Sequence, residues 1–172
     1  SNAIVVKQQP DDAEWDAGDI RHNVLRWTSS PNPPFGGYGP SFTNPRTGQI
    51  IGADIMLEFS FLTNRLRIKD VLQPGLGSGR TCELGAQMQM DQLFAAQALA
   101  AGGLSEALRE QLVRDSMYML ILHEIGHTLG LTHNMRASQL QPDAFDEAAV
   151  AAKGLSGSVM DLSLIHISEP TR

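Results

Sequence analysis

Residues 123–133 read His-Glu-Ile-Gly-His-Thr-Leu-Gly-Leu-Thr-His and hold three of the five histidines of this chain. His123 and His127 stand four residues apart, which on an α-helix places them about 40° apart around the axis, on one face. Gly130 can take the left-handed backbone conformation that ends a helix, so the chain can turn back and bring His133 beside them. Three imidazoles that leave a fourth position open are the ligand set of a catalytic rather than a structural zinc site.

Glu124 follows the first histidine directly and is not needed as a metal ligand. A carboxylate beside such a metal is placed to take a proton from a water molecule that the metal activates. A buried helix with incidental histidines is the competing interpretation. The glycine and the third histidine at fixed offsets argue against it.

The pattern resembles the signature of the metzincin zinc endopeptidases, in which His-Glu-x-x-His-x-x-Gly-x-x-His is followed by a methionine-bearing turn. Residues 158–161, Ser-Val-Met-Asp, are similar to that turn. Residues 20–27, 39–40 and 45–55 resemble a bacterial family of large metzincin-like proteins that are mostly uncharacterised. The resemblance covers residues 4–161, which we interpret as one metzincin-like catalytic domain.

The resemblance implies a zincin-like α+β domain with a twisted, mostly parallel mixed sheet, backed by helices that include a long active-site helix. It also implies that Met160 lies beneath the zinc imidazoles. The strand over residues 49–59 would be the sheet edge above the cleft, where an extended peptide pairs. A secreted, periplasmic or cell-envelope location is expected on the same ground.

The function implied is zinc-dependent hydrolysis of peptide bonds in a protein or peptide substrate. His123, His127 and His133 would hold Zn²⁺, and Glu124 would act as the general base. One alternative is a zinc-stabilised polypeptide-binding module without turnover, although a purely structural site gains nothing from Glu124. Another is a non-peptidase hydrolase that uses the same zinc site.

Glu147 offers a competing third ligand. It lies twenty residues after His127, a spacing at which another group of zinc peptidases uses a glutamate. The glycine at 130 and the methionine turn at 160 favour His133 instead.

Four other residues with metal-binding potential are interpreted as structural. Cys82 is the only cysteine, which excludes an internal disulfide, and its neighbours do not match a latency propeptide. Met88 and Met90 are expected to fill the core. His22, in a β-type segment, is expected to be a structural histidine.

The two ends of the chain are interpreted separately from the domain. Residues 1–3 resemble the scar of a cleaved expression tag. Residues 162–172 resemble the translation of a DNA sequencing adapter, so the natural protein would continue differently after Asp161. The resemblance also implies a strand and a helix before Ile4. We therefore expect uncovered surface at both ends, docking of residues 163–168 on such surface, and oligomerisation through it.

Composition excludes several classes of partner. The 172 residues suit one domain with a real core, and 42% of them are hydrophobic. The net charge of −6 without a basic cluster argues against nucleic acid and anionic membranes. No apolar run approaches the roughly 20 residues that span a bilayer.

The pattern along the chain predicts strands first and helices later. Strands are expected over residues 3–7 and 22–29, followed by a loop rich in proline and glycine that ends in a turn over residues 44–48. Alternation of apolar and polar residues from Ile51 to Phe61 predicts a half-buried strand.

Helices are predicted in the second half. After a loop over residues 73–85, residues 87–101 have helical spacing. Ser105 is then an N-cap for a helix that begins charged and becomes apolar before His123, so its buried end carries the metal-binding residues. A short helix is expected over residues 142–153.

Overall fold

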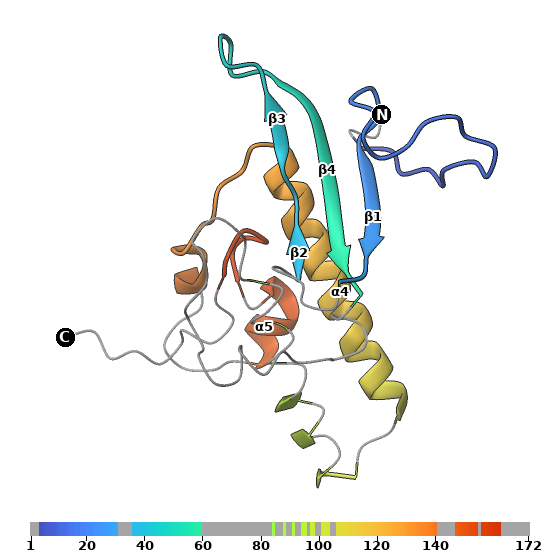
Figure 1. Cartoon of the computed structure of the whole chain (residues 1–172). Coiled ribbons are helices and arrows are strands. Elements are labelled where there is room, and N and C mark those ends of the chain that lie inside the picture. Colours follow the sequence, from blue (N-terminus) through green and yellow to red (C-terminus); the bar gives the residue numbers. More distant parts are fainter. Residues whose placement is uncertain are drawn as a thin grey trace.

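The computed structural model describes residues 4–30, 36–59, 106–140, 147–154 and 156–162, together with scattered positions between 84 and 103. Within this part of the chain, a four-stranded sheet packs against one long helix (Figure 1). The predicted α+β architecture, with a mixed sheet and a long helix that carries the histidines, is confirmed.

The sheet has β4 at its centre. β1 pairs with one side of β4 in parallel, while β2 and β3 pair with the other side in antiparallel orientation. The bounds are β1 Val24–Thr28, β2 Gly37–Tyr38, β3 Ser41–Thr43 and β4 Ile50–Glu58. The expected predominance of parallel pairing is therefore wrong for the described strands.

The position of β4 corrects the prediction that residues 49–59 form the edge above the cleft. Among the described strands, the edge on that side is made by β2 and β3, inside the stretch predicted to be a loop. The proline and glycine residues of this stretch led to the prediction of a loop in place of these strands. Pro40 bonds to β4 through its carbonyl alone, which accepts a hydrogen bond from the Asp54 amide at 3.1 Å, because proline has no N–H to donate.

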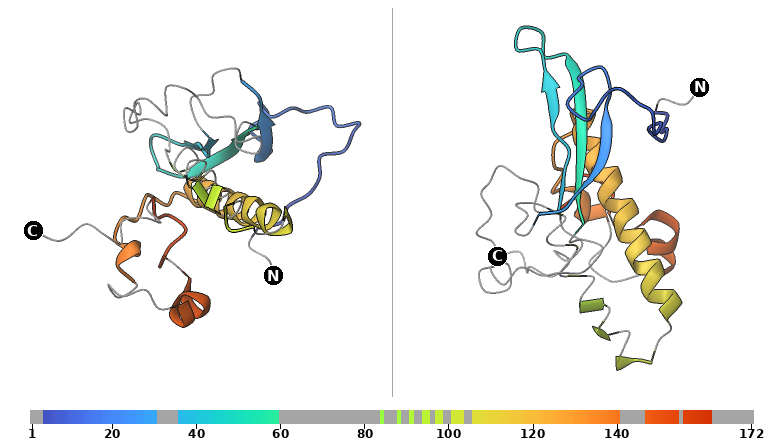
Figure 2. Two further views of the ribbon diagram at one scale, coloured as in Figure 1. Left: turned by 90° about the horizontal axis from the view of Figure 1, so that it is seen from below. Right: turned by 45° about the vertical axis from the view of Figure 1, so that its right-hand side comes forward.

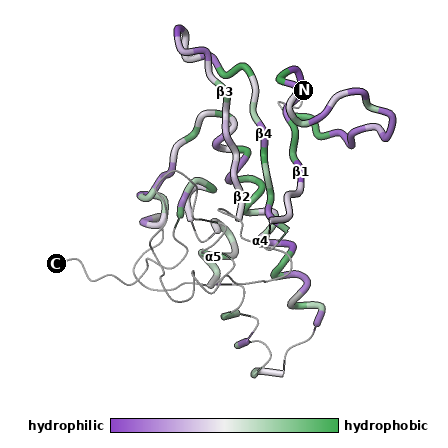
Figure 3. Tube along the Cα trace, in the orientation of Figure 1, coloured by the Kyte–Doolittle hydropathy of each residue, from purple (hydrophilic) through white to green (hydrophobic). Residues whose placement is uncertain are grey.

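The turn between β3 and β4 forms as its sequence predicts. The Asn44 carbonyl accepts a hydrogen bond from the Gly48 amide at 2.8 Å, and the Asn44 side chain accepts one from the Arg46 amide at 2.9 Å. Gly48 has a φ of 73°, which suits glycine. The hairpin tip is hydrophilic, while β4 carries hydrophobic stretches (Figure 3).

Helix α4, Glu106–Thr128, runs along one face of the sheet (Figures 1 and 2). The core lies at this contact, where Ile55 and Leu57 of β4 meet Leu120 of α4, with Leu84 and Met88 packed beside them. The described residues between 84 and 101 are helical, and Met88 is buried, as predicted.

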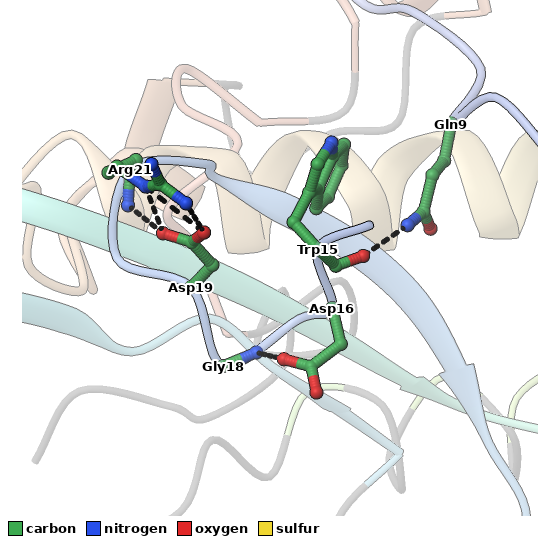
Figure 4. A network of polar contacts seen from close by, with 6 residues as sticks. All are labelled: Gln9, Trp15, Asp16, Gly18, Asp19 and Arg21. Atoms are coloured by element: carbon green, nitrogen blue, oxygen red, sulfur yellow. Dashed lines mark hydrogen bonds and ion pairs between the residues drawn. The ribbon is translucent and has the colours of Figure 1, made fainter. Parts of the chain in front are cut away.

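The N-terminal segment before β1 does not contain the strand predicted over residues 3–7, because residues 4–10 have no regular structure and their valines are exposed. Its contacts are mostly polar and local (Figure 4). Arg21 forms an ion pair with Asp19, and this hydrogen bonding lowers the pKa of the Asp19 carboxyl. The His22 ring stacks on Trp15 with 3.9 Å between centroids, which is a structural contact.

The chain after α4 forms two short helices, η1 (Ala137–Leu140) and α5 (Glu147–Lys153). The helix predicted over residues 142–153 is present from 147, and residues 141–146 lie outside the described part. Residues 1–3 and 163–172 also lie outside it, so their predicted origin and docking stay predictions. Within the described residues, no helix combines the length and apolarity needed to cross a membrane.

Candidate metal centre

The end of α4 reverses the chain at a glycine. The Gly130 amide donates to the His127 carbonyl at 2.9 Å, and the Leu131 amide donates to the Gly126 carbonyl at 3.0 Å. This pair of bonds, with a φ of 86° at Gly130, is the Schellman arrangement that ends a helix. The reversal returns the chain toward the helix and brings His133 beside the two helical histidines.

The three imidazoles of His123, His127 and His133 form one compact group. Each offers a nitrogen, and these nitrogens all lie within 4.8 Å of one another. The Nε2 atoms of His127 and His133 are 3.1 Å apart. Two nitrogens bound to one tetrahedral zinc ion at about 2.0–2.1 Å would lie about 3.3–3.4 Å apart, so the spacing of this pair is close to the one that zinc requires.

Backbone carbonyls orient two of the rings. The Nδ1 atom of His123 lies 2.6 Å from the Val159 carbonyl oxygen, and Nδ1 of His127 lies 3.0 Å from that of Leu131. Since a carbonyl can only accept, each Nδ1 must carry the proton, which leaves the Nε2 lone pair for a metal.

Burial favours the neutral form of two of these rings, those of His123 and His133. It lowers the pKa of His123 to about 4 and also lowers the pKa of His133. Neutral imidazoles at physiological pH are the form that binds metal.

Met160 lies under the helix that carries the ligands. It is 2% exposed, and a Cβ added to Gly126 would come within 2.2 Å of its sulfur. The glycine between the two helical histidines therefore allows the methionine to approach the helix backbone. The Met160 carbonyl also accepts a hydrogen bond from the Asn134 amide at 2.8 Å, directly after His133.

Glu124 is fully buried beneath the edge of the sheet. A Cβ added to Gly37 would lie 2.9 Å from its Oε1 atom, and one added to Gly39 would lie 2.6 Å from its backbone oxygen. These two glycines let β2 and the residue after it rest on the carboxylate.

Among the described residues, neither carboxylate oxygen of Glu124 has a partner with hydrogen-bond geometry. Burial raises the pKa of Glu124 to about 7. The nearby Gly39 backbone opposes this rise only in part, because its amide lies close to the carboxylate without meeting that geometry.

Several predicted or competing residues fall elsewhere. The side chain of Glu147, and all of Cys82 and Met90, lie outside the described part. Sequence reasoning missed the contribution of Val159 and the two glycines over Glu124. No local sequence pattern indicates these contributions, because the residues that they contact are distant in the sequence.

Comparison with known proteins supports the same assignment. Residues 105–170 match a family model described as Met-zincin. The segment that carries the three histidines is therefore similar to the Met-zincin family. Searches of curated proteins and of solved structures found no match. The matched range includes α4, the histidine group and Met160, and with the three-imidazole group it identifies the metal as zinc. The range also runs beyond Asp161, into the segment whose adapter origin stays a prediction.

Proposed function

We propose that this Met-zincin chain is a zinc-dependent endopeptidase with Glu124 as its general base. The observation that carries the proposal is a buried carboxylate that directly follows a metal-binding histidine and has no hydrogen-bond partner among the described residues. Such a group is costly to bury. A site that only held zinc for stability would not need it.

The chemistry proposed is hydrolysis of a peptide bond. Zinc held by His123, His127 and His133 would polarise the scissile carbonyl and lower the pKa of water. Glu124 would accept a proton from the attacking water as the new C–O bond forms. The same carboxyl would then give that proton to the leaving nitrogen as the C–N bond breaks.

The substrate class proposed is an extended polypeptide. Because β4 is internal to the described sheet, the edge of that sheet on this side is formed by residues 37–43. Tyr38 pairs with Met56 and Phe42 with Gly52, so the alternation of an antiparallel ladder directs the backbone groups of Gly37 and Ser41 away from β4, while the Gly39 amide faces Glu124. A peptide added along this edge would pass over Glu124.

The decisive test is cleavage of a peptide library by zinc-loaded wild-type protein and by Glu124→Gln. Glutamine keeps the shape of the side chain but cannot accept the proton, so turnover should fall at least about a hundredfold while zinc stoichiometry stays the same. Glu110→Gln, an exposed change on the same helix, is the matched control and should keep wild-type turnover.

Two results would contradict the proposal. Equal turnover in Glu124→Gln would remove the general-base role. A wild-type protein that binds zinc and library peptides without cleaving them would instead be the polypeptide-binding module considered above.

A further inference from the structure

The segment that carries Met160 is held in place by a hydrogen bond to a buried aspartate, which is not one of the metal-binding residues. Asp161 is 2% exposed, and its Oδ2 atom accepts a hydrogen bond from the Ser156 hydroxyl at 2.7 Å. This bond joins the two ends of residues 156–161.

Further hydrogen bonds inside the same segment restrict its backbone conformation. The Ser158 hydroxyl accepts from the Met160 amide at 3.1 Å, and the Ser158 carbonyl accepts from the Asp161 amide at 3.2 Å. These two hydrogen bonds within residues 158–161 therefore fix the local backbone conformation and the directions of its carbonyls.

Two of those carbonyls hold elements that carry zinc ligands. The Val159 carbonyl accepts from Nδ1 of His123 at 2.6 Å. The next carbonyl, that of Met160, accepts from the Asn134 amide at 2.8 Å, one residue after His133. The first and third ligands, which come from a helix and a loop, thus share one support.

We propose that Asp161 and Ser156 are positioning residues of the zinc site, which hold the Val159 and Met160 carbonyls where they orient His123 and His133. The inference rests on the zinc site of the proposed function but not on peptide hydrolysis. Groups that orient metal-bound histidines typically contribute ten- to a hundredfold to metal affinity.

The test measures zinc affinity by competition with a chromophoric chelator, at a temperature where every variant is folded. Ser156→Ala and Asp161→Ala should each weaken zinc binding by about ten- to a hundredfold. Because the two residues act through one bond, the double variant should be no weaker than the weaker single variant. Asp161→Asn keeps an acceptor oxygen and should recover most of the affinity.

Controls separate positioning from general stability. Asp115→Ala removes an exposed aspartate of α4 that accepts a hydrogen bond from Gln111 and should leave the affinity unchanged. Cobalt-substituted protein gives a spectrum that reports ligand geometry, and NMR detects the Nδ1 proton of His123. Both signals should shift in Ser156→Ala and return toward wild type in Asp161→Asn, which a merely structural role would not produce.

Wild-type zinc affinity in both Ser156→Ala and Asp161→Ala would overturn the inference, as would an equal loss in Asp115→Ala. If Asp161→Ala does not fold, Ser156→Ala alone decides. Failure of the zinc site itself would show differently, because His123→Ala would then bind zinc as well as wild type. Absence of peptide cleavage would count against the proposed function without affecting this result.

Discussion

Replacement of Glu124 by glutamine should stabilise the metal-free protein in a way that depends on pH. Burial raises the pKa of this carboxyl from 4.5 to about 7. Between these values the folded chain binds the proton more tightly than the unfolded chain, so the free energy of unfolding of the wild type falls as pH rises. Glutamine does not titrate and escapes this loss.

The magnitude follows from the two pKa values. At about 1.4 kcal/mol for each pH unit between 4.5 and about 7, the loss amounts to about 3 kcal/mol. Relative to wild type, Glu124→Gln should gain little at pH 4.5 and about 3 kcal/mol at pH 8, where the gain levels off. His123, whose pKa is lowered to about 4, gives the opposite slope over nearly the same range. It is present in both proteins and drops out of the difference.

The assay is urea unfolding of chelator-treated protein at pH 4.5, 6 and 8. Glu110→Gln, which lies exposed on the same helix, serves as the control and should differ from wild type by less than about 0.5 kcal/mol at each pH. In zinc-loaded protein the gain should shrink, since a nearby cation favours the carboxylate. A difference between Glu124→Gln and wild type that does not change with pH would refute the argument that Glu124 is buried without a partner.

Three further outcomes follow from the same geometry. His133→Ala should weaken zinc binding severely, as measured by chelator competition, and full affinity in this variant would move the third ligand elsewhere. Gly39→Ala places a Cβ 2.6 Å from the Glu124 backbone oxygen, which a side-chain movement cannot relieve, so urea unfolding should show a loss of about 1–3 kcal/mol. Ser41→Pro removes an outward N–H from the sheet edge and should raise KM for peptides at unchanged zinc stoichiometry, whereas Ser41→Ala should not. Equal KM values would contradict docking along this edge.

Local chemistry explains which parts of the fold could be predicted from sequence. The end of α4 depends on Gly130 and on the spacing of His127, both of which lie within one turn of the helix, and β4 follows from its alternation of apolar and polar residues. Helix ends and half-buried strands are governed by neighbouring residues. Their signals are therefore complete within a short window.

The sheet edge could not be predicted because its stability comes from distant contacts. Gly37 has no intrinsic preference for a strand, yet it pairs with Leu57 of β4 and lies over Glu124 of α4. Neither contact can be recognised from the residues that surround Gly37 in the sequence. The predicted strand over residues 3–7 failed for the converse reason, since its apolar residues have the composition of a strand but no partner strand among the described residues.

The glycines around the centre share one physical cause, although they come from separate parts of the chain. Glycine inside a helix costs about 1 kcal/mol relative to alanine, and glycine in a strand is also unfavourable. Glycine is nevertheless present at Gly37, Gly39 and Gly126, where another segment lies too close to leave room for a Cβ. Two of them admit the sheet edge onto Glu124, and the third admits Met160 beneath the helix. Residues with unfavourable local backbone preference thus occur at the positions that enclose the carboxylate and the zinc imidazoles. This is the expected pattern when the requirements of a site, and not those of the fold, determine the residue.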